Sequence, residues 1–210
     1  MEYNIDQQVK GTRILLGEES KKRRTILNEM ISIVEAKGFE EIILPSLEKS
    51  EVYMDKAGPE ILNQMYTFLD KGDRTLCLRP EGTATVQLLA DKYWQTQKDV
   101  KLWYFERCWR YERPQAGRYR EFFQFGVEWI NPRDIEKVRT ELIELAKQMV
   151  ELKTKNYEVN DSAKRGLSYY TGEGFEISVP TLGAQKQVVG GGTYKQGIGF
   201  AVGFDRLMII

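Results

Sequence analysis

The chain of 210 residues contains no histidine. Histidine is the usual general acid–base residue, the partner of catalytic serines and a frequent zinc ligand, so its absence excludes mechanisms and metal sites that depend on imidazole. The two cysteines, Cys77 and Cys108, fit no metal-binding or redox spacing. We therefore name no metal-ligating side chains, and a catalyst made from this sequence must act through arginine, glutamate, tyrosine or glutamine, or with a bound metal ion.

An excess of charge of one sign is also missing, because 31 Lys and Arg residues balance 31 Asp and Glu residues. A neutral chain has no long-range field to attract nucleic acid, so such a contact would have to come from a local patch. No apolar run approaches the length of a membrane span, and the first residues lack the pattern of a signal peptide. With two cysteines that we expect to be reduced, these features predict a cytoplasmic protein without membrane contact.

Apolar periodicity predicts a single domain over residues 1–210. Apolar residues recur at helical spacing in three segments, 18–37, 83–93 and 133–152. Extended segments are predicted at 39–45, 65–70, 74–80, 101–113 and 120–130, followed by a Gly-rich, strand-like last third and a helix that begins near Asp205. The strands are joined as hairpins, so we expect an α+β fold with an antiparallel β-sheet flanked by helices. No GxGxxG or Walker pattern opens a helix, which argues against dinucleotide-binding and P-loop folds.

The predicted hairpin of residues 101–113 and 120–130 has two different faces, because side chains alternate across a strand. One face is aromatic and apolar, and we expect it to pack against helices. The opposite face carries Arg110, Glu112, Phe122, Gln124 and Glu128. Gly126 lies between the last two of these residues, where a missing side chain would leave room for a small ligand. This face suits a nucleotide and an amine, although a solvated sheet face with cross-strand ion pairs fits the same composition.

The segment "WRYERPQAGRYREFFQFGVE" (Trp109–Glu128) resembles motif 2 of class II aminoacyl-tRNA synthetases, in the histidyl-tRNA synthetase version. Other segments resemble further parts of that family in the same order. They are "KGTR" and "EIILPSLE" (the start and motif 1), "LRPEGT" (the segment before motif 2), "RGLSYYTGEGFE" (the histidine-binding signature) and "GFAVGFDRL" (motif 3). The resemblance spans nearly the whole chain. It implies a class II catalytic domain and a ligase that activates histidine with ATP, in the service of protein biosynthesis.

The resemblance also implies an ATP site. Arg110 is similar to the motif 2 arginine that grips the α-phosphate, and Arg118 to the arginine that reaches the γ-phosphate. Glu112 is similar to the residue that meets the adenine amine. Phe122 is similar to the residue that stacks on one face of adenine, and Arg206 to the arginine that covers the other face and touches the phosphates. Mg²⁺ would bridge the phosphates and keep waters of its own.

Arg165 matches the family arginine that lies by the α-phosphate and helps to carry the reaction, so the resemblance implies Arg165, Arg110 and Arg206 as catalytic residues. The implied amino-acid pocket consists of Glu81, Thr83, Gln124, Glu128, Tyr170 and Tyr194. In a regular strand Arg165 and Tyr170 would point to opposite faces, so we expect a bulge or bend between them. A carboxylate that attacks the α-phosphorus needs positioning and fixed positive charge, which arginines supply without histidine.

The sequence departs from the typical family pattern at several points. One predicted helix replaces the insertion domain that typical members carry between motif 2 and the "RGL" segment. Ser168 stands where aspartate is usual, and Thr193 stands where arginine is usual. No anticodon-binding domain follows motif 3. We expect the adenylation residues to be retained, whereas these departures leave the acceptor open.

Three functions remain open from the sequence. The first is activation of histidine to histidyl-adenylate, followed by transfer to tRNA(His), through its acceptor end, or to another acceptor. The second is a non-catalytic histidine sensor similar to the regulatory subunit of ATP phosphoribosyltransferase. The third is a paralog that activates a different amino acid, with Ser168 and Thr193 as the residues that retune the pocket. The family also implies a homodimer across motif 1, and the apolar stripe of 26–34 fits either that interface or the core.

Overall fold

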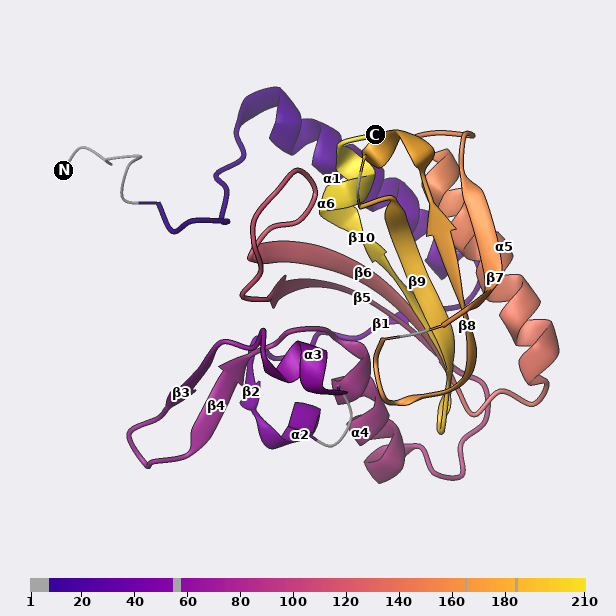
Figure 1. The fold of residues 1–210 in the computed structure, drawn as a ribbon. Coiled ribbons are helices and arrows are strands. Elements are labelled where there is room, and N and C mark those ends of the chain that lie inside the picture. The colour runs from indigo at the N-terminus through magenta and orange to yellow at the C-terminus, as the bar shows by residue number, and fades with distance from the viewer. Residues whose placement is uncertain (1–7, 55–57, 165, 184) are drawn as a thin grey trace.

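One large β-sheet dominates the structure (Figure 1). The computed structural model describes residues 8–54, 58–164, 166–183 and 185–210. The strand order is β1-β5-β6-β10-β9-β8-β7, and neighbouring strands are antiparallel except for β1 and β5, which are parallel. The strands are β1 (Glu40–Glu41), β5 (Val100–Trp109), β6 (Glu121–Ile130), β7 (Glu158–Ala163), β8 (Tyr170–Ser178), β9 (Gln187–Tyr194) and β10 (Gly197–Gly203). The predicted α+β class with an antiparallel sheet is confirmed.

Helices cover both faces of this sheet (Figure 1). One face packs against α1 (Gly17–Glu35), α5 (Ile135–Glu151) and α6 (Phe204–Met208). The other face packs against α4 (Thr83–Tyr93). Next to α4 lie a small antiparallel sheet and two short helices, namely β2 (Leu47–Lys49), β4 (Thr75–Leu78), β3 (Thr67–Leu69), α2 (Glu51–Met54) and α3 (Gly58–Leu62).

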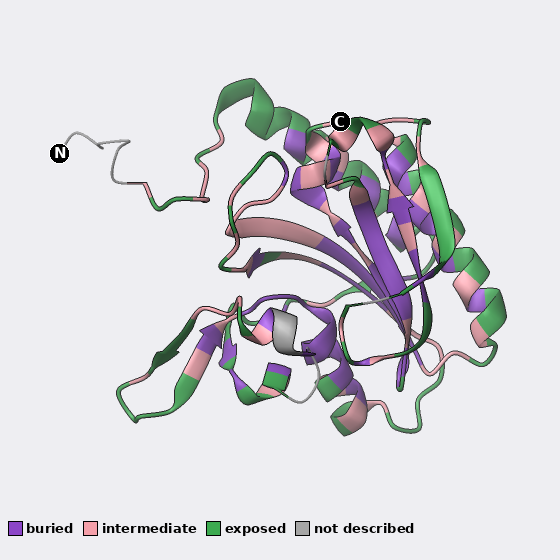
Figure 2. Cartoon of the chain, in the orientation of Figure 1, coloured by how far each residue is buried: buried purple, intermediate pink, exposed green. Residues whose placement is uncertain are grey.

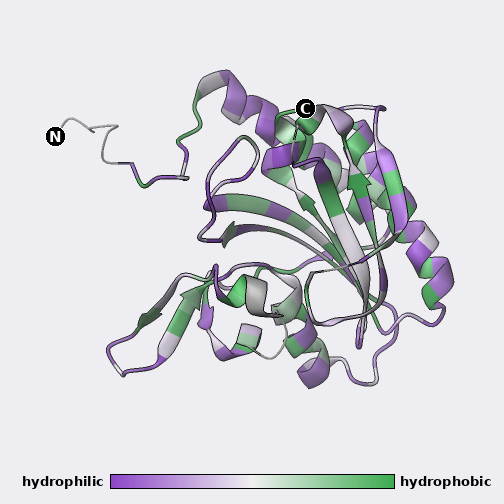
Figure 3. Ribbon diagram, viewed as in Figure 1, coloured by the Kyte–Doolittle hydropathy of each residue, from purple (hydrophilic) through white to green (hydrophobic). Residues whose placement is uncertain are grey.

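The aromatic face of the β5–β6 hairpin forms the centre of the main core, as the alternation predicts. The rings of Trp103 and Phe125 stack with centroids 5.5 Å apart, and both residues are buried. Met30 and Val34 of α1 are fully buried in the same cluster. Figure 2 shows buried positions along the strands and at intervals on the otherwise exposed α1, and Figure 3 shows the apolar residues along the strands. The buried residues of the α1 stripe therefore serve the core, with about 1.5–3 kcal/mol gained per large side chain buried.

The first long strand ends earlier than predicted. Strand β5 stops at Trp109 rather than at 113, because after the Arg110 N–H bonds to the Arg120 carbonyl the regular pairing with β6 ends and the chain bonds to other segments. The Trp109 N–H donates to the Arg79 carbonyl over 2.9 Å, and the Tyr111 N–H donates to the Gln64 carbonyl over 2.7 Å. Arg110 and Glu112 thus belong to a connecting loop of residues 110–120, the motif 2 loop. Their predicted placement on a sheet face is wrong.

The predicted helices agree closely with the observed ones. Helix α4 has the predicted bounds, and α1 and α5 differ from the predicted ranges by one or two residues at each end. Asp134 caps α5, since its side chain accepts the Lys137 N–H over 3.0 Å. Strand β7 was not predicted, because its residues are polar and mostly exposed. None of the helices in the described part of the chain is long and apolar enough to cross a membrane.

Candidate active site

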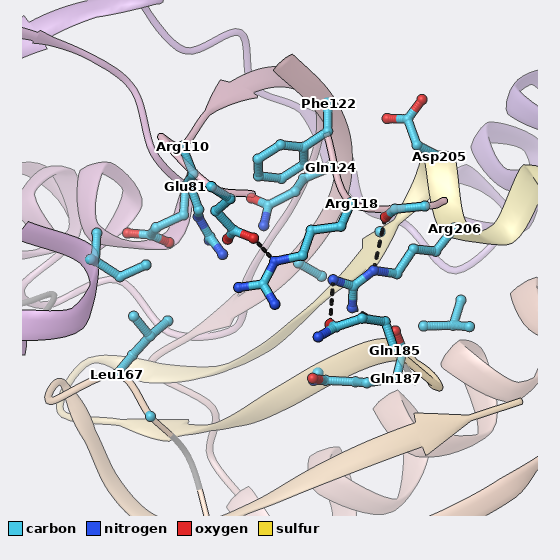
Figure 4. A pocket seen from close by; sticks show the side chains of 18 of the residues that line it. Glu81, Arg110, Arg118, Phe122, Gln124, Leu167, Gln185, Gln187, Asp205 and Arg206 are labelled. Carbon is cyan, nitrogen blue, oxygen red and sulfur yellow. Dashed lines mark hydrogen bonds and ion pairs between the residues drawn. The ribbon is translucent and has the colours of Figure 1, made fainter. Parts of the chain in front are cut away.

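A cavity of about 420 Å³ lies between the sheet, the motif 2 loop and the start of α4 (Figure 4). Most of the side chains predicted from the sequence line it. They are Glu81, Thr83, Arg110, Glu112, Arg118, Phe122, Gln124, Tyr170 and Arg206. Arg165 lies outside the described residues. Segments distant in sequence thus contribute to one space, with Arg206 at one end and the buried carboxyl group of Glu81, beside Arg110, at the other (Figure 4).

Arg206 is the most firmly held of the cavity arginines. Its Nε donates to the Gly117 carbonyl over 3.0 Å, its Nη1 to the Gln187 carbonyl over 2.9 Å and its Nη2 to Gln185 Oε1 over 3.1 Å. Burial lowers the pKa of Arg206, and the positive charges of Arg118 and Arg110 lower it further. This end of the cavity therefore concentrates positive charge, and an anion placed there would be stabilised.

The other two cavity arginines come from the motif 2 loop. Arg118 forms an ion pair with Glu112. Arg110 donates its Nε to the Pro80 carbonyl over 2.9 Å, and its guanidinium lies 5.3 Å from the ring centroid of Phe122. Figure 4 shows Arg118, Arg206 and Phe122 around the same space. The arrangement places one aromatic face and three guanidinium groups where a phosphate-bearing aromatic ligand would meet both.

Glu81 forms the other end of the cavity and caps helix α4. Its Oε2 accepts the Thr83 N–H over 2.7 Å, and its Oε1 accepts the Ala84 N–H over 2.9 Å. A carboxylate at a helix N-terminus satisfies unpaired N–H groups and favours the helix dipole. Burial nevertheless raises the pKa of Glu81 above its ordinary value. The cap fixes the position of a carboxyl group that faces the cavity.

Glu128 and Tyr194 do not line the cavity but lie behind its wall. The Thr83 hydroxyl donates to Glu128 Oε1 over 2.7 Å, and the Tyr194 hydroxyl donates to Glu128 Oε2 over 2.7 Å. Glu128 is fully buried, and burial raises its pKa to about 8. Thr83 therefore connects the cavity surface to a buried carboxyl group, and the alternative of a solvated sheet face is wrong at this position.

The expected room over Gly126 does not exist. Tyr104 lies directly across from Gly126 in the β5–β6 pair, and its fully buried ring covers the glycine. A Cβ atom at Gly126 would overlap that ring. The glycine therefore accommodates a tyrosine of the chain rather than a ligand, and the Tyr104 hydroxyl lies 3.4 Å from Thr83 Oγ1.

A third buried carboxyl group, Glu48, lies beside the same network. It accepts the Tyr53 hydroxyl over 3.0 Å and the Thr85 hydroxyl over 2.7 Å. The Tyr53 oxygen is also 3.2 Å from the Glu81 carbonyl. Burial raises the pKa of Glu48. The Tyr53 hydroxyl thus links Glu48 to the backbone of Glu81.

Some residues at the site were not predicted. Tyr169 lines the cavity beside Tyr170, and its hydroxyl donates to Glu81 Oε2 over 3.3 Å. Strand β8 begins only at Tyr170 and shifts register before Gly174, so the alternation assumed for this segment does not apply, and both tyrosines line the cavity. Gln185 and Gln187 also hold Arg206, and no motif points to either residue.

Neither of the residues suspected of retuning the pocket lines the cavity. Ser168 lies against Gly58, where an added Cβ would come within 2.5 Å of its Oγ. Thr193 contributes a carbonyl that accepts the Thr171 hydroxyl over 3.4 Å. Their direct contact with a ligand in this cavity is therefore not supported.

The comparisons with known proteins agree with this geometry. The family model for histidyl-tRNA synthetase matches residues 11–160. The histidine–tRNA ligase of Methanospirillum hungatei is 30% identical over an alignment of 305 positions, which covers 97% of this chain and 75% of the relative. The chain belongs to the histidyl-tRNA synthetase family. The ligase of Methanocaldococcus jannaschii is 44% identical over 129 residues, which cover 61% of this chain and 31% of that protein.

Solved structures of histidyl-tRNA synthetases share the fold. The apo enzyme of S. aureus superposes with a TM-score of 0.80 at 27% identity, covering 97% of this chain and 69% of that one. A Bacillus halodurans protein described as an ATP phosphoribosyltransferase regulatory subunit or histidyl-tRNA synthetase reaches 0.81 at 18% identity, covering all of this chain and 84% of that one, which supports the fold alone. The alignment of 305 positions exceeds the 210 residues here, so the Methanospirillum synthetase contains stretches with no counterpart in this chain.

Proposed function

We propose that this chain binds ATP and histidine in the cavity and joins them into histidyl-adenylate, with release of pyrophosphate. The observation that carries the proposal is that Arg110, Arg118 and Arg206 line one cavity, with Arg206 at one end and the buried carboxyl group of Glu81 beside Arg110 at the other (Figure 4). Positive charge suits a triphosphate, and a buried carboxyl group suits an ammonium or imidazole. Membership of the histidyl-tRNA synthetase family supports the same assignment.

In this proposal, ATP lies against Phe122 with its phosphates between the arginines. Arg110 grips the α-phosphate, Arg118 leaves its ion pair with Glu112 to meet the γ-phosphate, and Glu112 then accepts from the adenine amine. Arg206 covers the other face of adenine. Mg²⁺ would come with the phosphates, because the described residues contain no cluster of three or more metal-ligating side chains.

The reaction itself needs positioned charge rather than a proton-transfer residue. An oxygen of the histidine carboxylate attacks the α-phosphorus, and the bond from that phosphorus to the bridging oxygen breaks, so pyrophosphate leaves with the electron pair. Negative charge grows on the phosphate oxygens, where Arg110, Arg206 and Arg165 would stabilise it. The hydrogen bonds that hold Arg110 and Arg206 in place reduce the entropy lost in reaching the reactive geometry.

Histidine would be recognised at the carboxyl end of the cavity. Glu81, Thr83 and Gln124 would hold the α-amino group, while Tyr170 would bond the imidazole. Glu128 and Tyr194 lie behind the wall. They would act on the ligand through Thr83, or directly after a small movement of this wall. The acceptor of the histidyl group would be the end of tRNA(His) or another nucleophile.

We also propose a homodimer. The short strand β1 is an edge of the large sheet, and exposed edges commonly serve as pairing surfaces. Beside it Ile43 is 81% exposed and Leu47 is 50% exposed, which is unusual for large apolar side chains close together in sequence. Sedimentation should give a dimer at micromolar concentration, and a monomer there would contradict the proposal.

The test of the function is amino-acid-dependent exchange between ATP and pyrophosphate, with each of the twenty amino acids in turn. We expect exchange with histidine alone, and its loss in Arg165→Gln and Arg206→Gln. Arg133→Gln is the matched control, because Arg133 is exposed and outside the cavity. Exchange with another amino acid would contradict histidine specificity. Histidine binding in calorimetry without exchange would replace the proposal with a histidine sensor.

A further inference from the structure

The segment "KGTR" (Lys10–Arg13) lies against the motif 2 loop. None of its side chains lines the cavity proposed to bind ATP. The Gly11 carbonyl accepts the Arg120 N–H over 2.8 Å and the Glu121 N–H over 3.3 Å. Gly11 has φ = +86°, and a Cβ there would lie within 3.0 Å of Arg120 and Pro114 side-chain atoms. Only glycine fits this contact, so the segment is held at the base of the loop.

The Arg13 side chain reaches from this segment to both sides of the cavity. Its guanidinium lies 3.7 Å from the ring centroid of Tyr119, and it forms an ion pair with Asp205. Tyr119 directly follows Arg118, and Asp205 directly precedes Arg206. A single side chain thus contacts the neighbours of two cavity arginines that come from separate elements.

Charge neutralisation of Asp205 does not by itself require Arg13. Asp205 is buried, and it also accepts Arg23 Nη1 over 2.9 Å and the Phe123 N–H over 2.6 Å. Arg23 contacts the rings of Phe123 and Phe204. The two arginines therefore share an ion-pair partner but differ in one respect, since only Arg13 is stacked on the motif 2 loop.

We propose that Arg13 is a positioning residue, which clamps Tyr119 to Asp205 and so holds Arg118 and Arg206 at the spacing that the phosphates of ATP require. The motif 2 loop has little regular pairing of its own, with a single bridge between Gln115 and Arg118. Ordering such a loop before the ligand arrives lowers the entropy lost on binding. Arg13 touches no substrate in this role. The effect of the clamp on ATP binding rests on the proposed function.

The first test measures the loop itself by hydrogen exchange of the full chain. Arg13→Gln should speed exchange of the amides in residues 110–120, whereas the matched control Arg23→Gln should leave that loop near its original rate. Arg13→Lys keeps the charge and should restore part of the protection. Equal exchange of this loop in the original chain and in Arg13→Gln would overturn the clamp. This readout does not depend on whether ATP binds.

The second test measures the consequence for ATP in pyrophosphate exchange. Arg13→Gln should raise the KM for ATP by about tenfold, as expected for loss of a partly buried cation–π contact with its ion pair, with the KM for histidine changed less than about twofold. Arg23→Gln should lower the denaturation midpoint with a smaller change in the KM for ATP. Equal changes in the two variants would overturn the clamp. A protected loop in a chain that does not bind ATP would refute the proposed function and leave the clamp standing.

Discussion

Replacing Glu128 with glutamine should change how the stability of the protein depends on pH. Glu128 is fully buried among hydroxyl groups, and burial raises its pKa from 4.5 to about 8. Glutamine has the same shape, keeps an oxygen that accepts from Thr83, and offers an amide that can donate to the Tyr194 oxygen. The variant therefore removes the titration while retaining most contacts.

The sign follows from which state holds the proton. Because the folded-state pKa lies above the unfolded-state value, the stabilising contribution of Glu128 is complete below about pH 4.5 and is lost as the pH rises through 8. Each pH unit within that window costs about 1.4 kcal/mol of unfolding free energy. Between pH 5 and pH 8 the loss amounts to roughly 3–4 kcal/mol, which is a large part of the 5–15 kcal/mol typical of domains.

The assay is urea denaturation of both proteins at several pH values from 5 to 9. The unfolding free energy of the original chain minus that of Glu128→Gln should fall steadily up to pH 8 and then level off. Glu81 and Glu48, whose pKa values burial also raises, will leave some pH dependence in the variant. Parallel curves for the two proteins would refute the reasoning, since they would mean that Glu128 is ionised in the folded protein at neutral pH.

Other substitutions test separate parts of the structure. Gly126→Ala should destabilise the fold by about 1–3 kcal/mol in urea denaturation, because the new methyl group overlaps Tyr104; Gly172→Ala, with open space around it, should have little effect. Arg206→Lys should raise the KM for ATP about tenfold or more in pyrophosphate exchange, because the single nitrogen of an ammonium cannot reach three acceptors that three separate guanidinium nitrogens now meet, and an unchanged KM would contradict this. Asp134→Ala should cost about 1 kcal/mol in urea denaturation through loss of the α5 cap, and an unchanged midpoint would contradict that cap.

Local patterns predicted most of the secondary structure because local physics decides it. The apolar period of α4 and the start signal in "PEGT" place its bounds at Thr83 and Tyr93. The alternation of Trp103 and Phe105 across a strand identifies the face that packs against helices. Such signals need only neighbours in sequence, and the structure agrees with them.

Contacts between distant segments decided the features that the sequence could not predict. Strand β5 ends where Trp109 pairs with Arg79, a partner thirty positions away, and no local signal marks that end. The strand register places Tyr104 across from Gly126, and the tyrosine ring fills the space beside the glycine. The burial of the Glu128 side chain depends on helix α4, which covers that face of the sheet. The residues of the site could thus be predicted, but not which of them line the cavity and which lie behind its wall.

The ion pairs of Asp205 have a consequence for the order of folding. They join residues 192 and 182 positions apart in the sequence. Closing so long a loop is entropically expensive, and contacts of such sequence separation form slowly compared with helices and hairpins. The arginine end of the cavity is therefore expected to be completed late. During refolding, helical circular dichroism should recover before nucleotide binding does, so binding of a nucleotide would report that the chain has finished folding rather than merely collapsed.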